Sequence, residues 1–477
     1  MSSYPLGHLS NRTLKAQNVL VIDKNGRIQF TPFVPGPIFP PEILGEIFIH
    51  CLEGADPVFP CPESAPLLLC RICRRWRDVA LSTPALWSSV FLDLDKLADP
   101  GCYDASSSYT VSRQWLDNAR AIPLSLGLAD IVEGHAPNDQ LKSLVAFVLS
   151  LSHQWRSLEL ELEAPSILAK SAFRDFKGAV PLLEKLSIST YHRAIRITFP
   201  TAPKLRELSV TTYNSKIQVP WPQLLTFRSE DISIASCLNI LRHSSRLVNG
   251  TFKIRGNPLT LPRTVVVRPH LRHLALGAAY SSFRQPLLPL TILDCLKTPA
   301  LKSLTLESAD SGTGHTVAVS SLLSFISRSS PRLHTLALSF ISTTPAALIE
   351  CLKATPSLVH FKFQPRRRIG RHDIEPIFLQ LTGHPKFLPN LESLHMVFAR
   401  DPPPSSPAPV TASVLVEMLR WRWVTPGVAR LRRFRLAHSY HFSMLGQTVL
   451  ADLEWRRLRE EGMLSYIGER SGCDTFI

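Results

Sequence analysis

A recurring pattern of apolar positions runs through most of this chain. From residue 155 onward, units of the form Leu-x-x-Leu-x-Leu recur, with Ile, Val, Phe or Met in place of some leucines. A proline stands two residues before the units that begin at Leu183, Leu205, Leu224, Leu271, Leu301, Leu333, Leu358 and Leu391, and related units without it begin at Trp155, Leu247 and Leu431. The alternation of apolar and polar residues predicts one short strand in each unit.

The segments between these strands carry apolar residues at helical spacing. Helices are predicted over residues 322–328 and 347–354, and earlier in the chain over residues 139–152. A unit of one strand and one helix cannot bury its apolar side alone, so neighbouring units must stack. The sequence therefore predicts an α/β fold with a parallel strand ladder over residues 93–440. The middle apolar residues should share one core: Leu186, Leu208, Leu274, Leu304, Leu336 and Leu394.

The two ends of the chain and one internal segment fall outside this pattern. Residues 1–37 mix Ser, Asn, Gly and Pro and are interpreted as an N-terminal tail, with a small hairpin around Val19–Ile22 as the alternative. The proline-rich run over residues 401–409 predicts a solvated loop, with a docking peptide as the alternative. Residues 441–477, with a predicted helix and a final strand, are expected to cap the ladder.

Residues 38–92 carry a different pattern, that of short amphipathic helices. Pro40 and Pro41 open the first helix. Its apolar residues are Ile43, Leu44, Ile47, Phe48 and Leu52. A second, apolar and basic helix is predicted after Pro66, and it carries Leu68, Leu69, Ile72, Cys73 and Trp76. Thr83-Pro84 ends this helix. A segment of roughly fifty residues buries little surface, so a partner or a neighbouring domain should cover its apolar stripe.

This arrangement resembles the F-box family, whose pattern runs from Leu-Pro-x-Glu-Ile-Leu through an apolar helix to Val-Cys-x-x-Trp and Leu-Trp. The matching residues are Pro40, Glu42, Ile43, Leu44, Ile47, Leu52, Ile72, Cys73, Arg74, Arg75, Trp76, Leu86 and Trp87. Phe39 stands where the family usually has Leu, and the loop over residues 53–65 is longer than usual. The alternative is a helical cap on the repeat domain.

The resemblance implies docking onto a Skp-type adaptor and, through it, onto a cullin in a ubiquitin ligase. The residues expected to bind the adaptor are Pro41, Ile43, Leu44, Ile47, Phe48, Leu52, Leu69, Ile72, Trp76, Leu86 and Trp87. The family's role is to hold a protein substrate near the enzyme that carries ubiquitin, so that proximity raises the effective concentration of substrate lysines.

The recurrence of leucines resembles a leucine-rich repeat with irregular spacing and without the Asn or Cys that usually follows the strand. The units at Leu224 and Leu247 are the least regular, because Ser229 and Gly250 replace apolar residues there. The predicted architecture is α/β: short all-α F-box helices followed by an irregular leucine-rich-repeat-like solenoid. A different α/β stack is the alternative.

Hydropathy and cysteine content indicate the cellular compartment of the protein. No apolar run approaches the roughly 20 residues needed to span a bilayer, and the N-terminus lacks the apolar core of a signal peptide. The nine cysteines lie in apolar contexts that suit reduced thiols. We therefore expect a cytoplasmic or nuclear protein without a membrane partner.

The motifs that carry chemistry are weak in this chain. Cys70-x-x-Cys73 suggests zinc, but only one such pair occurs and it lies on a predicted apolar helix. Residues 312–315 have the glycines of a phosphate loop without its lysine, and no catalytic motif occurs. The sequence predicts a non-catalytic protein with no metal and no cofactor. Arg366, Arg367, Arg368 and Arg371 form a basic cluster, interpreted as a solvated loop, with a nuclear-localisation patch or an anion site as the alternatives. Trp421 and Trp423 are expected on a packed amphipathic helix.

A basic surface is predicted near the C-terminal end of the ladder. The chain carries a net charge of +15, and residues 358–440 hold 13 Lys and Arg against 5 Asp and Glu. The residues between the apolar strand positions should project from the open face. In the late units these are His360, Lys362, His395, Arg433 and Arg435. They are the expected substrate-binding residues, and they favour an acidic or phosphorylated protein segment. Merely solvated polar positions are the alternative.

The sequence thus predicts the substrate-recognition subunit of a Skp-cullin-F-box ubiquitin ligase. One alternative is a repeat-based interaction scaffold that is not coupled to ubiquitination. Another is a nucleic-acid binder that uses the basic C-terminal half, which would show a steep salt dependence of binding.

Overall fold

A computed structural model describes most of the chain. The residues described are 18–22, 28–32, 39–52, 57–98, 105–130, 139–162, 176, 178–190, 196–199, 201–255, 265–279, 288–308, 320–341, 343–365, 371–398, 411–438, 449 and 452–469. The chain divides into two compact units, one formed by Met1–Ala55 with Cys61–Leu86 and the other by Asp56–Pro60 with Trp87–Ile477.

The described residues of the smaller unit include a hairpin and three α-helices. Strands β1 (Asn18–Ile22) and β2 (Ile28–Pro32) pair antiparallel, so the hairpin that the sequence offered as an alternative to a tail is present. The helices are α1 (Pro41–His50), α2 (Leu69–Ile72) and α3 (Arg74–Ser82). Helix α1 begins with Pro41 at its first position, as predicted, because that position needs no amide donor.

The prediction of a single helix after Pro66 is wrong, because the segment forms two helices that meet at Cys73. Cys73 has an extended backbone, with φ of −157° and ψ of 167°, and therefore ends α2. Its Sγ accepts a hydrogen bond from the Trp76 amide at 3.4 Å and so caps the first turn of α3. The apolar periodicity continues through this break, which is why the sequence pattern concealed it.

The larger unit is built on one long parallel sheet. Its 14 described strands have the order β20-β19-β18-β17-β16-β15-β13-β11-β10-β8-β6-β5-β4-β3, and every neighbouring pair is parallel. The parallel ladder is thus confirmed. The strands are β3 (Ser89–Asp93), β4 (Leu124–Asp130), β5 (Trp155–Leu162), β6 (Lys185–Ser189), β8 (Glu207–Thr212), β10 (Thr226–Ser233), β11 (Asn249–Arg255), β13 (His273–Ala278), β15 (Ser303–Glu307), β16 (Thr335–Ile341), β17 (His360–Pro365), β18 (Ser393–Phe398), β19 (Arg433–His438) and β20 (Leu464–Glu469).

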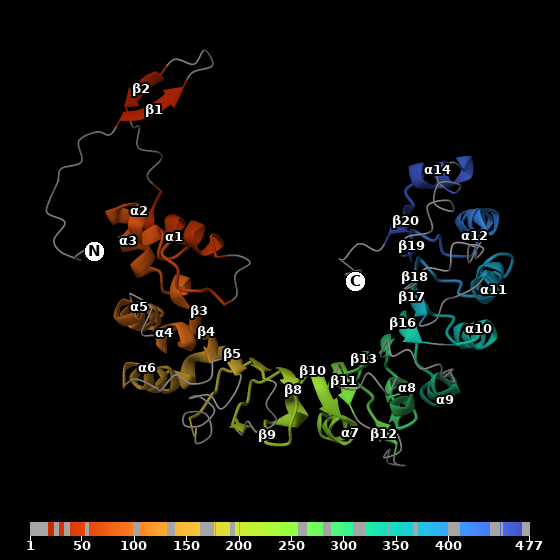
Figure 1. Ribbon diagram of the computed structural model, residues 1–477, viewed down its shortest axis with the longest axis horizontal. Helices are drawn as coiled ribbons and strands as arrows, with labels where there is room; N and C mark the ends of the chain where they lie inside the picture. Colours follow the sequence, from red (N-terminus) through yellow and green to blue (C-terminus); the bar gives the residue numbers. More distant parts are fainter. Residues whose placement is uncertain are drawn as a thin grey trace. The chain divides into compact units, whose positions relative to one another are not determined.

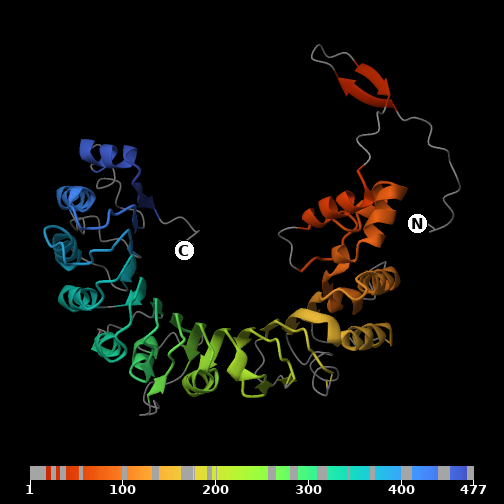
Figure 2. The ribbon, with the colours of Figure 1, turned by 180° about the vertical axis from the view of Figure 1, so that it is seen from behind.

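The helices of this unit lie on one side of the strands in the part of the chain that the structure describes (Figures 1 and 2). They are α4 (Leu94–Ala98), α5 (Ala105–Asn118), α6 (Asp139–Ser150), α7 (Ile234–His243), α8 (Leu288–Leu293), α9 (Ser320–Ser329), α10 (Pro345–Lys353), α11 (Arg371–Leu381), α12 (Ala412–Val424) and α14 (Leu453–Glu460). Two small parallel pairs, β7 (Ile197–Thr198) with β9 (Ile217–Gln218) and β12 (Val266–Val267) with β14 (Leu296–Lys297), complete the unit. The side of the sheet opposite the helices is the open face.

In six units the recurring proline occupies a reverse turn that leads into the strand. The Leu205 amide donates to the Ala202 carbonyl at 3.1 Å, which makes Pro203 the second residue of the turn. Proline suits this position because its fixed φ matches the turn. The same bond joins Leu183 to Val180, Leu224 to Trp221, Leu301 to Thr298, Leu358 to Thr355 and Leu391 to Leu388. Leu247 donates to Ser244 in a unit without the proline, so the turn does not depend on it.

Backbone hydrogen bonds also link each unit to the next. The Arg272 carbonyl accepts the amides of Lys302 and Ser303 at 2.8 and 3.0 Å, and the Lys302 carbonyl accepts those of His334 and Thr335 at the same distances. The carbonyls of Glu184, Arg206, Leu225, Val248, His334 and Val359 each accept two amides in the same way. The main chain therefore satisfies these amide and carbonyl groups itself. At the turn before Leu391, the Asn390 side chain adds a hydrogen bond to the Pro356 carbonyl at 3.2 Å.

The core lies between the sheet and the helices. The six middle leucines predicted to share a core are at most 2% exposed, which confirms that prediction. In the irregular unit at Leu247, the Phe252 ring of the same strand fills the space where Gly250 has no side chain. A Cβ on Gly250 would lie 2.7 Å from the Phe252 Cε2 atom. In the unit at Leu224, Ser229 is fully buried at the position of the missing apolar residue.

Several predicted features lie outside the described residues. These are the proline-rich run over residues 401–409, the glycine motif over residues 312–315, and the cluster Arg366–Arg368 together with the side chain of Arg371. The final predicted strand is described as β20, which pairs in parallel with β19 and stands last in the strand order. Among the described residues, no helix is both long and apolar enough to cross a bilayer.

Candidate functional site

The predicted adaptor-binding residues of the smaller unit divide by exposure. Ile43, Ile47 and Ile72 are 49%, 42% and 52% exposed, and Pro41 is also exposed. Ile43 and Ile47 stand four residues apart on α1 and therefore share one helix face. Exposed isoleucines are costly in water, so this face is suited to a partner.

The other predicted adaptor residues are less accessible than the sequence suggested. Those buried within the chain are Leu44, Phe48, Leu69, Leu86 and Trp87, and those partly exposed are Leu52 and Trp76. The buried side chains form cores of the chain itself and are not open to a partner in this structure, contrary to their prediction as adaptor-binding residues. The Phe48 ring packs on the Trp76 ring with centroids 4.9 Å apart, and Trp87 belongs to the larger unit, where it meets Trp115 edge-on.

Two further exposed apolar residues of the smaller unit were not predicted as site residues from the sequence. Phe39 precedes α1 and is 44% exposed, and Leu68 precedes α2 and is 39% exposed. The Arg75 guanidinium donates to the Phe39 carbonyl, which ties the start of α1 to α3. Phe39 was noted only as a departure from the family pattern, although a large apolar residue just before a helix is itself a signal. We use the term apolar face of the smaller unit for five of its exposed apolar residues, Phe39, Ile43, Ile47, Leu68 and Ile72.

The cysteines of this segment show no metal-binding arrangement. Within the described ranges, no group of three or more His, Cys, Asp and Glu side chains is close enough to hold a metal ion. Cys73 caps α3 instead, and Cys70 is partly buried, which raises the pKa of its thiol. Its carbonyl accepts a hydrogen bond from Arg77 Nε at 2.8 Å.

The predicted substrate-binding residues form two cross-strand rows on the open face of the larger unit. Parallel register aligns His360 of β17 with Ser393 of β18 and Arg433 of β19. The second row contains Lys362, His395, Arg435 and Tyr466, from four consecutive strands. The structure therefore brings all five predicted residues together on neighbouring strands.

Two of these five residues are not freely exposed, contrary to the prediction. His395 is 5% and Arg435 is 7% exposed. For Arg435 the reason lies in β20, whose Tyr466 stands beside it in the row. The Arg435 guanidinium lies 5.2 Å from the centre of the Tyr466 ring, a cation–π contact that buries it. His360 and Arg433 are exposed, and Lys362 is half-buried.

A cavity of about 430 Å³ opens between β18, β19 and β20. Its lining residues include His395, Arg433, Arg435, Arg459, Leu464 and Tyr466. Arg459, Leu464 and Tyr466 were not predicted as site residues, because the segment that carries them was interpreted as an end cap. For Leu464 and Tyr466, which stand two residues apart in the predicted final strand, the alternation of side chains along a strand was the available signal.

The electrostatics of this end of the open face are positive. Partial desolvation of the His360 ring and the positive charge of Arg433 lower the pKa of His360, while the charge of Glu392 raises it. Lys362 and Arg433 have no ion-pair partner among the described residues. The cluster of basic groups therefore has charge available for an anion.

The middle of the same face differs, because its charges bind one another. Lys253 Nζ lies 2.6 Å from Glu230, and Arg255 lies 2.7 Å from Asp231. The hydrogen bonds and charges of Lys253 and Arg228 lower the pKa of Glu230 against the effect of its burial. This region is electrically compensated and leaves less free charge for a ligand.

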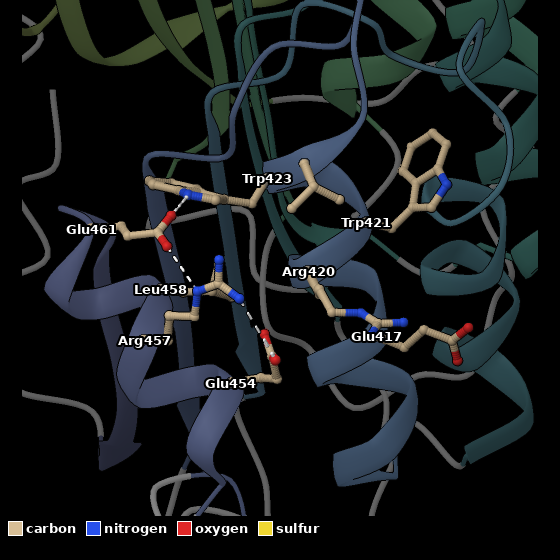
Figure 3. Close-up of a pocket in the computed structure, with 9 residues that line it drawn as sticks. Glu417, Arg420, Trp421, Trp423, Glu454, Arg457, Leu458 and Glu461 are labelled. Atoms are coloured by element: carbon tan, nitrogen blue, oxygen red, sulfur yellow. Dashed lines mark hydrogen bonds and ion pairs between the residues drawn. The ribbon is translucent and has the colours of Figure 1, made fainter.

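A second cavity, of about 320 Å³, lies between α12 and α14 on the helical side (Figure 3). Glu461 accepts hydrogen bonds from Trp423 Nε1 at 2.6 Å and from Arg457 Nε at 2.9 Å, and these bonds lower its pKa. Arg457 also pairs with Glu454 at 4.0 Å. These contacts join the two helices. Because Glu461, Arg457 and Glu454 already bond within the protein, they are less available to a ligand, and the cavity on the open face is the better candidate site.

Comparison with protein-family models and with curated proteins gives no match for this chain.

Proposed function

We propose that this protein is the substrate-recognition subunit of a Skp-cullin-F-box ubiquitin ligase. The apolar face of the smaller unit would dock onto a Skp-type adaptor, and the leucine-rich-repeat-like sheet of the larger unit would hold a protein substrate. The chain would perform no bond chemistry itself. It would act by raising the effective concentration of the substrate near the ubiquitin-carrying enzyme.

The observation that supports this proposal most is the exposure of Ile43, Ile47 and Ile72 within a segment that matches the F-box pattern. Three isoleucines between 42% and 52% exposed in so small a unit favour a partner that covers them. The parallel sheet supports the second half of the proposal, because it offers an extended face free of helices in the described part of the chain.

Co-purification of the full chain with a Skp-type adaptor and a cullin tests the proposal. The wild-type chain should retain both proteins. Ile47→Asp with Ile72→Asp should weaken adaptor binding by about 30-fold or more, because each charge would enter an apolar interface. The matched control is Leu379→Asp on α11, since Leu379 is 52% exposed and lies in the larger unit.

The outcomes separate the ligase from a scaffold. Retention of both partners by the wild type and the control, with loss from the double variant, supports the proposal. If the wild-type chain bound neither the adaptor nor a cullin, the proposed role in a ligase would be wrong.

A further inference from the structure

The cavity between β18, β19 and β20 has a distinct chemical character. Its described lining contains Arg433, Arg435 and Arg459 together with His395, and no carboxylate. Beside these cations stand Leu464, which is 68% exposed, and Tyr466, which is 40% exposed. One site thus combines several positive groups with an apolar surface that water covers poorly.

We propose that this cavity binds an extended protein segment in which an acidic or phosphorylated residue stands next to a large apolar residue. This proposal rests on the proposed function in one respect, namely that the bound segment belongs to a ligase substrate. The site itself follows from the residues that line it.

The preference for an anion follows from charge balance. Arg433 and Arg459 are exposed, and guanidinium groups bind carboxylate and phosphate through paired, charge-assisted hydrogen bonds. The cations in the middle of the face have acidic partners at 2.6 and 2.7 Å, so they compete less well for such a ligand. Arg435 is already held against Tyr466 and would contribute charge rather than a movable side chain.

The preference for an adjacent apolar residue follows from the position of Leu464 and Tyr466. Register aligns Leu464 with Arg433 and Tyr466 with Arg435, so apolar and cationic side chains are neighbours across one strand pair. An anion bound by Arg433 therefore places its neighbouring group over Leu464. Burial of an aliphatic or aromatic side chain there would remove exposed leucine surface from water.

The preference for an extended chain follows from the place of β20 in the sheet. Among the described strands, β20 pairs only with β19 and is the last in the order. Its outer edge presents backbone donors and acceptors to which a further strand can add. A cavity of about 430 Å³ holds one or two side chains, which suits anchors projecting from such a segment.

The test uses the full chain, immobilised, and three pools of short synthetic peptides. Each pool has one fixed central residue, glutamate, phosphoserine or glutamine, between randomised positions, and the bound peptides are read by mass spectrometry. We expect the glutamate or phosphoserine pool to be retained about tenfold better than the glutamine pool. We also expect Leu, Ile or Phe to be enriched next to the fixed residue. The two anionic pools distinguish a carboxylate from a phosphate ligand.

Variants locate the binding site. Arg433→Glu with Arg459→Glu should abolish the preference for the anionic pools, and Leu464→Ser should remove the enrichment of apolar neighbours. Arg432→Glu is the matched control, because Arg432 is exposed and adjacent but does not line the cavity. Thermal unfolding of each variant establishes that the chain remains folded, and Arg433→Gln serves as a milder change if the double variant unfolds.

Three results would overturn the inference: no preference for the anionic pools, equal loss of binding in the Arg432 and Arg433 variants, or displacement of the peptides by an arbitrary oligonucleotide. The last two would indicate binding of any polyanion. Adaptor co-purification is measured on the same variants and should be unchanged. Peptide selection without adaptor binding would therefore refute the ligase while leaving the site in place, and the converse would refute only the site.

Discussion

The Arg422 guanidinium donates a hydrogen bond of 2.6 Å to the carbonyl of Leu388, although the two residues lie 34 positions apart. Arg422 on α12 is fully buried, and it also reaches the carbonyls of Phe387 and Leu391 at 3.3 and 3.4 Å. Leu388 has a φ of 48°, in the left-handed region that a leucine rarely adopts. One cation thus holds a strained turn that leads into β18. Burial of the guanidinium lowers the pKa of Arg422 to about 10.

Replacement of Arg422 by Met should destabilise the larger unit by about 2–4 kcal/mol, because buried carbonyls would lose their donor. Lys at this position reaches fewer carbonyls and should recover only part of the loss. Urea unfolding measures the change. Arg420→Met on the same helix is the control, since Arg420 is exposed. Equal stability of the Arg422→Met chain and the control would show that this cation is dispensable.

Truncation of two neighbouring residues on α1 should affect different properties, stability for Leu44 and adaptor binding for Ile43. Leu44→Ala should lower the stability of the smaller unit by about 2–5 kcal/mol, because Leu44 is 6% exposed. Ile43→Ala should change stability by no more than about 0.5 kcal/mol, because Ile43 is 49% exposed, and should weaken adaptor binding instead. Thermal unfolding and adaptor titration measure the two effects. A stability loss for Ile43→Ala as large as that for Leu44→Ala would contradict this assignment.

Gly250→Ala should destabilise the larger unit by about 1–3 kcal/mol, because the new Cβ would lie 2.7 Å from the fully buried Phe252 ring. Adding Phe252→Leu should reduce this cost, since the smaller side chain leaves room. Gly277→Ala on the neighbouring strand is the control, because its Cβ would meet no atom closer than 3.4 Å. Denaturant unfolding of the wild type, the single variants Gly250→Ala and Phe252→Leu, and the double variant gives the coupling between positions 250 and 252.

The protonation of His360 should depend on Arg433. Burial and the charge of Arg433 lower the pKa of His360, so the folded chain binds this proton less readily than the unfolded chain. This contribution to stability should be constant above the unfolded pKa of about 6.5 and should fall as pH drops below it, until His360 is protonated in both states. Nuclear magnetic resonance titration should show the pKa of His360 rising in the Arg433→Gln variant. An unchanged pKa would mean that the two side chains do not interact.

The strands and their parallel pairing could be predicted from the sequence because local rules govern them. Proline two residues before Leu205 fits the second position of a reverse turn, and alternating apolar residues such as Leu208 and Val210 select one face of a strand. Both requirements are met by residues within one unit. The repetition of the unit then implies stacking, because no unit can bury its apolar side alone.

The interruption at Cys73 could not be predicted in the same way. The apolar period of the segment is compatible with one helix or with two helices, and the choice depends on whether the Cys73 thiol caps the Trp76 amide. A capping bond is a contact between particular atoms, and hydrophobic periodicity carries no information about it.

The candidate sites show most clearly what depends on local sequence and what depends on tertiary structure. By itself the sequence placed His395 and Arg435 on the open face and Leu44 beside Ile43 on an apolar helix, since side-chain direction follows from local periodicity. Only the tertiary structure decided that Tyr466 covers Arg435 and that Leu44 is buried while Ile43 remains exposed. Accessibility depends on which strand or helix comes to lie alongside, and that neighbour is supplied by residues distant in the chain.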